Sequence, residues 1–260
     1  MFGKAINDLV GGLALWRVWT YQAWHEMTAR YKRTILGPFW LAAQMLVTSM
    51  CLALVWGILM NRDMKEILPY ITAGMLCFQV VSFMFNDGPE LFLGAGNTIK
   101  NHAYPFTYYI LETACKAVLT FGHNVIVFWA VCAAVQNIAV PNWTFLIAMP
   151  IVIITVMCWG TIIGLVSARF RDLRFLLPYF GQLMFYVTPI VWRVGDISTK
   201  RAYVAQFNPL YGLLEIIRAP LLGHVAPAHA WALAIGTMVT GMITWVLVFP
   251  PFRKRIAFWI

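Results

Sequence analysis

Long apolar stretches separated by short polar ones dominate the chain. The clearest is residues 144–167, TFLIAMPIVIITVMCWGTIIGLVS, which contains no charged residue. A helix needs about 20 apolar residues to cross the hydrocarbon core of a bilayer. The pattern therefore predicts an all-α integral membrane protein, forming one permease-sized domain over 1–260 with six spans. We place them at about 39–60, 68–85, 117–136, 144–167, 175–192 and 230–249.

Basic residues gather at the ends of these runs and predict an orientation. Arg169, Arg171 and Arg174 follow the 144–167 run directly. Over the six predicted spans, 12 Lys and Arg fall on the side that holds both termini, and six fall on the other side. Lys and Arg are enriched in cytoplasmic loops of membrane proteins. We therefore expect both termini to be cytoplasmic.

The segment before the first run, about 5–33, has a helical pattern with two unlike faces. Ile6, Leu9, Leu13 and Trp16 recur at three- and four-residue steps, and polar residues occupy the opposite face. A tryptophan-rich amphipathic helix of this kind is suited to the membrane interface. The alternative, a helix packed on a soluble domain, is weaker because no soluble domain is evident in the pattern.

A shorter helix is predicted between the fifth and sixth spans. Asn208-Pro209 is a typical helix start, and an apolar stripe follows it. Glu215 and Arg218 are three residues apart and can pair on one helix. A segment of about 13 residues cannot cross a bilayer. We expect a re-entrant element on the outer side that is buried in protein.

Composition supports the membrane assignment. The chain is 61% hydrophobic and 11% charged, with a mean hydropathy of +0.73, whereas globular chains carry about 25% charged residues. The net charge of +9 could suggest nucleic acid, but basic residues at span ends fit anionic lipid headgroups better. We therefore expect membrane lipids, and no nucleic acid, as partners. The five widely spaced cysteines predict neither a disulfide nor a metal site.

Few residues in the chain point to catalysis. The sequence has no GxxxxGK[ST] phosphate loop, no GxSxG and no HExxH, and its histidines lack metal-ligand spacing. His123 and Asn124 lie inside the third predicted span, where polar residues are functional candidates. Interhelical hydrogen bonding is the alternative role for this intramembrane pair. Glu112 and Lys116 are four apart and should form a structural ion pair.

Aromatic side chains of the fifth predicted span form another candidate group. Phe180, Phe185 and Tyr186 could stack on sugar faces if they line a lumen, or could serve packing alone. Arg30 and Arg33 precede the first span at the depth where a lipid phosphate would sit. Their planar guanidinium groups suit phosphate, although orientation and lipid anchoring would explain them as well.

Several segments, in order along the whole chain, resemble type 2 ABC exporter permeases for polysaccharides. Residues 30–40, RYKRTILGPFW, resemble the RYxxSxLGxxW signature of that family, with Thr34 where serine is usual. Residues 168–192 resemble its second cytoplasmic loop and fifth span, and residues 208–223 resemble its outer gate region. Residues 121–124, FGHN, resemble a histidine-asparagine pair of the lipopolysaccharide O-antigen export branch.

The resemblance implies a function for the chain. Such permeases are homodimers that work with two copies of a cytoplasmic ATPase, and they export a polysaccharide linked to undecaprenyl diphosphate across the bacterial inner membrane. ATP and Mg would be bound by the partner ATPase, and this chain would hold no cofactor and be no enzyme. The absent phosphate loop fits that division.

The same resemblance implies roles for particular residues. The loop from Asp87 to Pro105 would hold a coupling helix with its core at Pro89–Gly96, although Gly94 and Gly96 weaken such a helix. The docking residues of this helix would be Glu90, Leu91, Phe92 and Leu93. Those of the outer gate would be Leu214, Glu215 and Arg218.

Other functions stay open at this point. A capsule or teichoic acid exporter, or a drug or lipid efflux permease, would use the same scaffold. A continuous aromatic lumen would favour a polymer, and a closed apolar vestibule would favour a small drug. A membrane-embedded transferase would need a catalytic histidine or paired carboxylates at the membrane face, and the ten acidic residues offer no convincing pair there. A purely structural membrane partner would not explain the interfacial and re-entrant elements.

Overall fold

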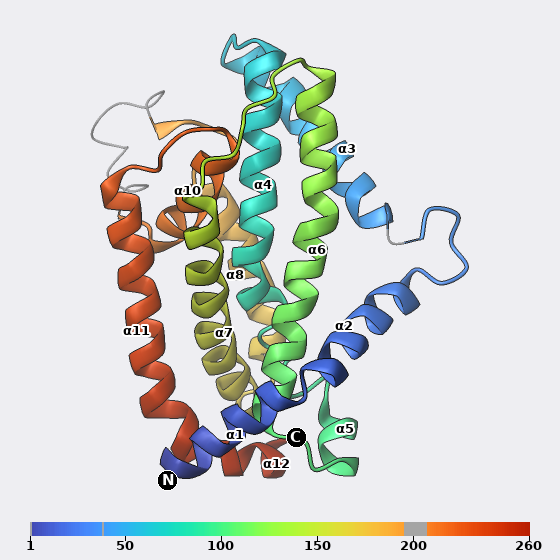
Figure 1. The fold of residues 1–260 in the computed structure, drawn as a ribbon, viewed down its shortest axis with the longest axis vertical. Coiled ribbons are helices and arrows are strands. Elements are labelled where there is room, and N and C mark those ends of the chain that lie inside the picture. The colour runs from blue at the N-terminus through green and yellow to red at the C-terminus, as the bar shows by residue number, and fades with distance from the viewer. Residues whose placement is uncertain (1, 38, 195–206) are drawn as a thin grey trace.

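A computed structural model describes residues 2–37, 39–194 and 207–260, and their regular structure is helical throughout. Five helices are long and apolar enough to cross a membrane, and they run side by side in a bundle (Figure 1). The chain is thus a multi-pass membrane protein, as predicted. These helices are α3 (Phe39–Leu59), α4 (Met64–Asn86), α6 (Phe106–Ala134), α7 (Phe145–Arg169) and α11 (Ala228–Phe252).

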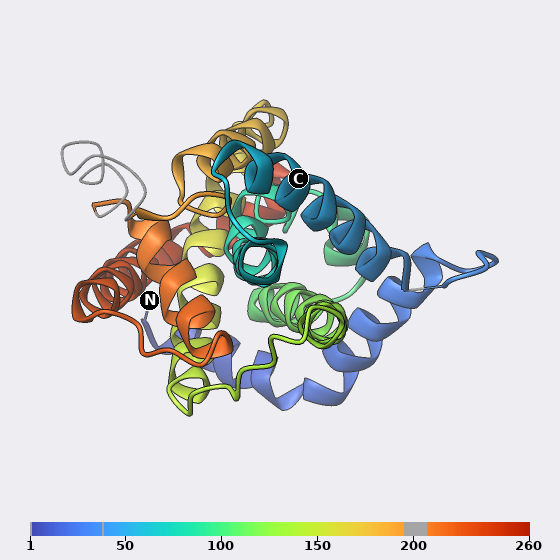
Figure 2. The same cartoon turned by 90° about the horizontal axis from the view of Figure 1, so that it is seen from above.

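Helix α4 is the centre of the bundle. Seen from above, it lies between α3 on one side and α10 and α11 on the other (Figure 2). Protein buries 78% of its most apolar stretch, against 17–33% for the other four long helices. The outer helices therefore keep apolar faces free for lipid or for another subunit. The main core joins α4 to α7, α10 and α11, through side chains such as Ile71, Leu76 and Leu213.

The fifth predicted span is shorter than expected. Residues 175–192 were predicted to cross, but α8 covers Leu173–Val187, only 15 residues. At 1.5 Å per residue it is about 22 Å long, less than the ~30 Å hydrocarbon core. The helix ends at Thr188, which is extended because it precedes Pro189. The third span is longer than predicted, since its polar approach from Thr107 is already part of α6.

Helix α10 (Pro209–Leu221) begins where the sequence predicted. The Asn208 side chain accepts a hydrogen bond from the Leu210 N–H. The helix lies at the end of the bundle opposite both termini (Figure 1), and the Asn142 N–H from the α6–α7 loop donates to its Pro220 carbonyl at 2.9 Å. It packs on α4, α7 and α11. The short helix is therefore enclosed by protein, as predicted.

The N-terminal segment forms two helices at the other end, α1 (Phe2–Ala14) and α2 (Trp16–Arg30), which run across α6 (Figure 1). Gly12 permits this crossing, because a Cβ there would lie 2.4 Å from the Thr107 hydroxyl. Outward from the bundle, α1 and α2 expose large apolar side chains, namely Ile6, Val10, Leu13, Trp16, Tyr21 and Trp24.

The predicted coupling helix is displaced along the sequence. Residues 87–95 form successive turns instead of a helix over Pro89–Gly96, and α5 then covers Gly96–Asn101. Two glycines within the predicted core disfavour a regular helix there. The loop is ordered by a second apolar cluster, which joins Phe92 to Tyr108 and Phe249. The chain ends nearby in η2 (Arg253–Arg255) and α12 (Ile256–Trp259).

Candidate functional site

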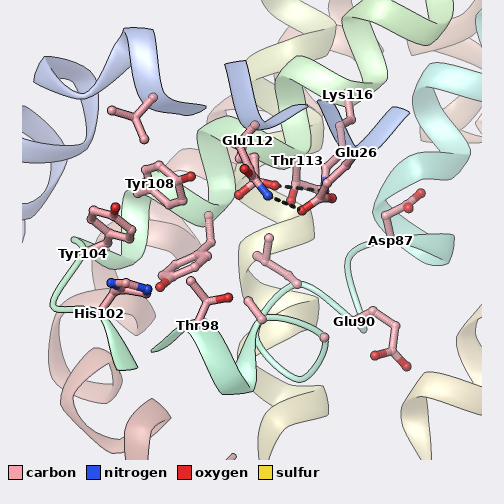
Figure 3. Close-up of a pocket in the computed structure, with 16 residues that line it drawn as sticks. Glu26, Asp87, Glu90, Thr98, His102, Tyr104, Tyr108, Glu112, Thr113 and Lys116 are labelled. Carbon is pink, nitrogen blue, oxygen red and sulfur yellow. Dashed lines mark hydrogen bonds and ion pairs between the residues drawn. The ribbon is translucent and has the colours of Figure 1, made fainter. Parts of the chain in front are cut away.

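A cavity of about 530 Å³ opens at the end of the bundle that holds both termini. Helix α2, the turns at 87–95, α5 and the first turns of α6 enclose it. Figure 3 shows a group of charged side chains along one side, aromatic rings on a second side, and Asp87 and Glu90 on a third, with the Glu90 carboxylate directed outward. The cavity as a whole does not come from a single sequence motif, because four separate segments contribute.

Lys116 holds the charged side of the cavity together. Its Nζ lies 2.8 Å from Oε2 of Glu26 and 3.2 Å from Oε1 of Glu112. The Glu112–Lys116 pair is therefore confirmed. The sequence did not indicate Glu26, which belongs to α2 and is also bonded by the Gln22 amide at 3.1 Å. This three-residue cluster fastens α2 to α6.

The cavity is acidic as a whole. Four carboxylates, from Glu26, Asp87, Glu90 and Glu112, line it with one ammonium, from Lys116. Partial burial acts to raise the pKa of Glu26, but the Lys116 ammonium and its hydrogen bond outweigh burial and hold that pKa below its ordinary value. Asp87 borders the open cavity with an exposed side chain, and desolvation by the protein around its carboxylate raises its pKa to about 6, against the charges of Lys116 and Arg30.

The aromatic side of the cavity is a stack of rings. His102 stacks on Tyr104 at 5.5 Å between ring centroids, and Tyr104 stacks on Tyr108 at 4.8 Å. Tyr109 meets Tyr108 edge-on and is only 3% exposed. Its hydroxyl has no hydrogen-bond partner in the part of the chain that the structure describes.

The four predicted coupling residues divide into exposed and buried ones. Glu90 is exposed, and its carboxylate lies 4.0 Å from Nε of Arg174 after α7. Leu91 and Phe92 are buried, with the Phe92 ring edge-on to Phe106. Leu93 is half-buried. Glu90 is therefore the member best placed to contact a docked protein, while Leu91 and Phe92 hold the loop to the bundle.

The two predicted headgroup arginines lie in different settings. Arg30, at the end of α2, lines a smaller cavity of about 230 Å³, which shares Glu26, Asp87 and Lys116 with the larger one. Arg33 is exposed on the turn that follows and has a left-handed backbone with φ of 70°. Both arginines are exposed, and of the two only Arg30 lines a cavity.

The two residues of the predicted intramembrane pair, His123 and Asn124, make different contacts. His123 Nδ1 donates a hydrogen bond to the Leu119 carbonyl of its own helix, and its ring lies near Trp24 of α2. Asn124 is fully buried and donates a hydrogen bond from its amide to the Gln79 side chain of α4. Asn124 thus makes the interhelical contact that was the alternative role for the pair.

A second charged cluster lies at the opposite end, around Tyr70. Arg218 is 2% exposed, and its guanidinium lies 4.3 Å from the Tyr70 ring centroid. Its Nε donates to Glu215 at 3.0 Å, which confirms the predicted pair, and Nη1 donates to the Pro189 carbonyl at 2.6 Å. The guanidinium of Arg193 also lies over the Tyr70 ring, 4.8 Å from its centroid. Arg218 therefore fixes α10 to the segment that follows α8.

Two further groups of predicted residues have clear positions. Leu214 is completely buried, so it faces the core of the bundle. Phe180 and Phe185 contact Phe85 and Phe78 of α4, edge to face at 5.5 Å. Tyr186 is 64% exposed. Helix α8 thus has aromatic side chains on both its packed face and its open face.

Together, the apolar bundle and its polar clusters at either end define a multi-pass membrane protein built around buried charges. Comparison of sequences gives the family. The ABC-2 type transporter family model matches residues 18–222, and the chain belongs to that family. It is therefore a membrane permease subunit and not itself catalytic, and permeases of this family work with ABC ATPase subunits.

Similar proteins of known name are distant but cover most of the chain. An O-antigen export system permease protein RfbA of Klebsiella pneumoniae is 24% identical over 197 residues, 73% of this chain and 74% of its own length. The protein of that name from Myxococcus xanthus is 19% identical over 212 residues, 78% of this chain and 79% of its own. These matches support polysaccharide export at the level of the family.

Proposed function

We propose that the chain is the permease of an ABC exporter that carries an O-antigen polysaccharide, linked to undecaprenyl diphosphate, across the bacterial inner membrane. The observation that carries this proposal is the match to O-antigen export permeases over about three-quarters of both chains. A homodimer of the chain would work with two copies of a separate ATPase, which binds ATP and Mg.

The distribution of charge supports the proposed orientation. The 12 basic residues of the larger group belong to segments around α1, α2, α5, the C-terminal end of α7 and η2. In Figure 1 these elements lie toward the end that holds both termini. By the positive-inside tendency this end is cytoplasmic. The chain must then cross once more between α7 and α11, since these two helices run in the same direction (Figure 1), and α8 provides at least part of that sixth crossing.

Each end of the bundle would then have a task. At the cytoplasmic end, Arg30 borders the 230 Å³ cavity and binds the diphosphate of the carrier, while Glu90 contacts the ATPase. At the outer end, α10 with Leu214, Glu215 and Arg218 forms the gate. Phe180, Phe185 and Tyr186 are the aromatic side chains proposed for the polysaccharide path.

The test is loss and recovery of surface polysaccharide. Deleting the gene in its host should remove long-chain O-antigen from the lipopolysaccharide ladder and leave undecaprenyl-linked polymer at the cytoplasmic face. The wild-type chain should restore the ladder, but only together with an ATPase subunit that hydrolyses ATP.

Other outcomes of the same experiment separate the alternatives. An unchanged O-antigen ladder with loss of capsule or teichoic acid would assign the cargo to another polymer. Unchanged surface polysaccharides with raised sensitivity to drugs would indicate an efflux permease. A polymer of altered structure at normal surface abundance would indicate a transferase.

A further inference from the structure

The Tyr70 side chain, near the start of α4, contacts two arginines from different parts of the chain. Its ring centroid lies 4.3 Å from the guanidinium of Arg218 on α10 and 4.8 Å from that of Arg193 after α8. Its hydroxyl donates a hydrogen bond to the Trp192 carbonyl at 3.2 Å. The face of an aromatic ring attracts a cation, and it does so more strongly where water is excluded. Tyr70 therefore ties two other elements to the central helix of the bundle.

The two cation–π contacts lie in different surroundings. The side chain of Arg218 is 3% exposed and that of Arg193 is 38% exposed, so the Arg218 contact is the stronger one. Arg193 also faces the carboxylate of Glu66, in the first turn of α4, at 3.7 Å. Because Arg193 lies near the surface, it can be replaced with little effect on folding.

Residues 188–193, which follow α8, form bends instead of a helix. Ile190 is fully buried against α4, where a Cβ on Gly74 would lie 3.0 Å from the Ile190 carbonyl oxygen. The Pro189 carbonyl accepts a hydrogen bond from Arg218. Irregular backbone at membrane depth is tolerated where protein encloses it. The position of this segment therefore depends on its contacts with α4 and α10.

We propose that Tyr70 is a positioning residue, which holds the segment 188–193 and α10 closed against α4 at the outer gate. This inference rests on the proposed function, because it takes the gate from it. Helix α4 is the most buried of the five long helices, and it reaches from Tyr70 to the turns at 87–95 at the other end of the bundle (Figure 1). A displacement of α4 would therefore pass through one ring to both elements that close the gate.

A ring that only fills space can be told apart from a ring that binds cations. Phe128 of α6 allows the comparison, since it lines the same cavity of about 450 Å³ as Tyr70 and Arg218 and is 1% exposed. Within residues 2–37, 39–194 and 207–260, no guanidinium lies over the Phe128 ring. Phe128→Leu therefore removes ring packing from this cavity and leaves the contacts of both arginines in place.

The first experiment measures whether the segment 188–193 comes away from α4. The reporter is Val191→Cys, because Val191 is buried, in a background whose five native cysteines are replaced by alanine. A membrane-impermeant maleimide labels the purified permease in lipid nanodiscs, without ATPase or polysaccharide. Tyr70→Leu should raise the labelling rate by about tenfold, since it removes both cation–π contacts. Tyr70→Phe keeps the ring and loses one hydrogen bond, so it should raise the rate by at most about threefold.

The control in the same assay is Phe128→Leu, which should leave the labelling rate of the reporter nearly unchanged. Equal rates for Tyr70→Leu and Phe128→Leu would reduce the Tyr70 ring to packing and overturn the proposal.

A second experiment uses variants that leave the core intact. Arg193→Gln should raise the labelling rate by about threefold while Tyr70 is present, and should add nothing in the Tyr70→Leu background, because its effect passes through the ring. Glu66→Gln is the matched control, since it removes the ion pair at 3.7 Å and leaves both guanidinium groups on the ring. The same increase from Arg193→Gln in both backgrounds would overturn the proposal.

The positioning role and the proposed function fail separately. Labelling needs neither the ATPase nor the polysaccharide, so a labelling result against Tyr70 removes this inference alone. A wild-type chain that does not support O-antigen export removes the proposed function and leaves the labelling result standing.

Discussion

The guanidinium of Arg253 lies 3.2 Å from the carboxylate of Asp8 and joins the end of α11 to the first helix of the chain. The same carboxylate accepts hydrogen bonds from the first backbone N–H groups of α6, those of Phe106 at 3.2 Å and Thr107 at 3.0 Å. Asp8 is 6% exposed. One side chain therefore caps a spanning helix and fixes both terminal segments to it.

We expect Asp8→Ala to destabilise the protein by roughly 2–4 kcal/mol, because it removes the cap and takes from Arg253 its carboxylate, leaving only the bond to the Lys4 carbonyl. Thermal unfolding in detergent would show this as a lower melting temperature. Asp172→Ala is the control, since Asp172 precedes α8 but makes no capping hydrogen bond and is exposed. Equal melting temperatures for both variants would contradict the assigned role of Asp8.

The Lys116 cluster should respond unequally to loss of its members. Lys116→Met leaves Glu112, whose side chain is 9% exposed, without a cation, and should cost about 3–5 kcal/mol. Glu26→Gln removes a partner whose side chain is 45% exposed and should cost at most about 1 kcal/mol. Melting temperatures of the two variants and of the double variant Lys116→Met with Glu112→Gln test this, and the double variant should recover part of the loss. A larger loss from Glu26→Gln than from Lys116→Met would refute this account.

In the proposed coupling loop, substitutions of buried and of exposed residues should affect stability and coupling to the ATPase separately. Phe92→Ala empties a fully buried site and should destabilise the protein by about 3–5 kcal/mol. Glu90→Lys changes an exposed charge and should leave the melting temperature nearly unchanged, yet reduce export and permease-stimulated ATPase activity. Retention of both activities in the Glu90→Lys variant would show that the ATPase docks elsewhere.

Apolar length was enough to predict most of the bundle. The runs at 39–60, 68–85, 144–167 and 230–249 correspond to α3, α4, α7 and α11, because the hydrocarbon thickness sets their length. Whether a proline would end a helix or lie within it was the ambiguous point. Pro150 and Pro178 lie inside helices, whereas the chain leaves α8 at Thr188, just before Pro189. Membrane helices tolerate proline only where neighbours satisfy the backbone, which the sequence alone does not specify.

The contacts that were predicted and those that were missed differ in how far apart their two residues lie in the sequence. Glu112 with Lys116, and Glu215 with Arg218, follow helical spacing and were foreseen. Glu26 reaches Lys116 across 90 residues, and such contacts depend on how helices pack. Local spacing carries no signal for them, so neither the acidic cavity nor the junction at Asp8 could be predicted.

The proposed outer gate at α10 should be more sensitive to loss of one charge than of two. Arg218→Ala leaves Glu215, whose side chain is 16% exposed, unpaired and removes the contact with the Pro189 carbonyl. That should cost about 3–5 kcal/mol, and less when Glu215→Ala accompanies it. A cysteine at buried Leu214 reports on the gate, because a membrane-impermeant thiol reagent should not label it in the resting protein. We expect labelling in the Arg218→Ala background and little in the double variant, whereas complete labelling with Arg218 and Glu215 intact would mean an ordinary exposed loop.

The two arginines before the first span should contribute unequally to export. Arg30 borders the cavity of about 230 Å³, so Arg30→Lys keeps the charge but loses the planar fork that binds phosphate in two places. Arg33 lies on an exposed turn, so Arg33→Lys should leave export near the wild-type rate. We expect Arg30→Lys to lower the export rate by about tenfold, a difference of roughly 1.4 kcal/mol. The neighbouring Lys32→Arg variant is the control, since a fork placed outside the cavity should add nothing, and normal export by the double variant Arg30→Lys with Arg33→Lys would reduce both arginines to orientation and lipid anchoring.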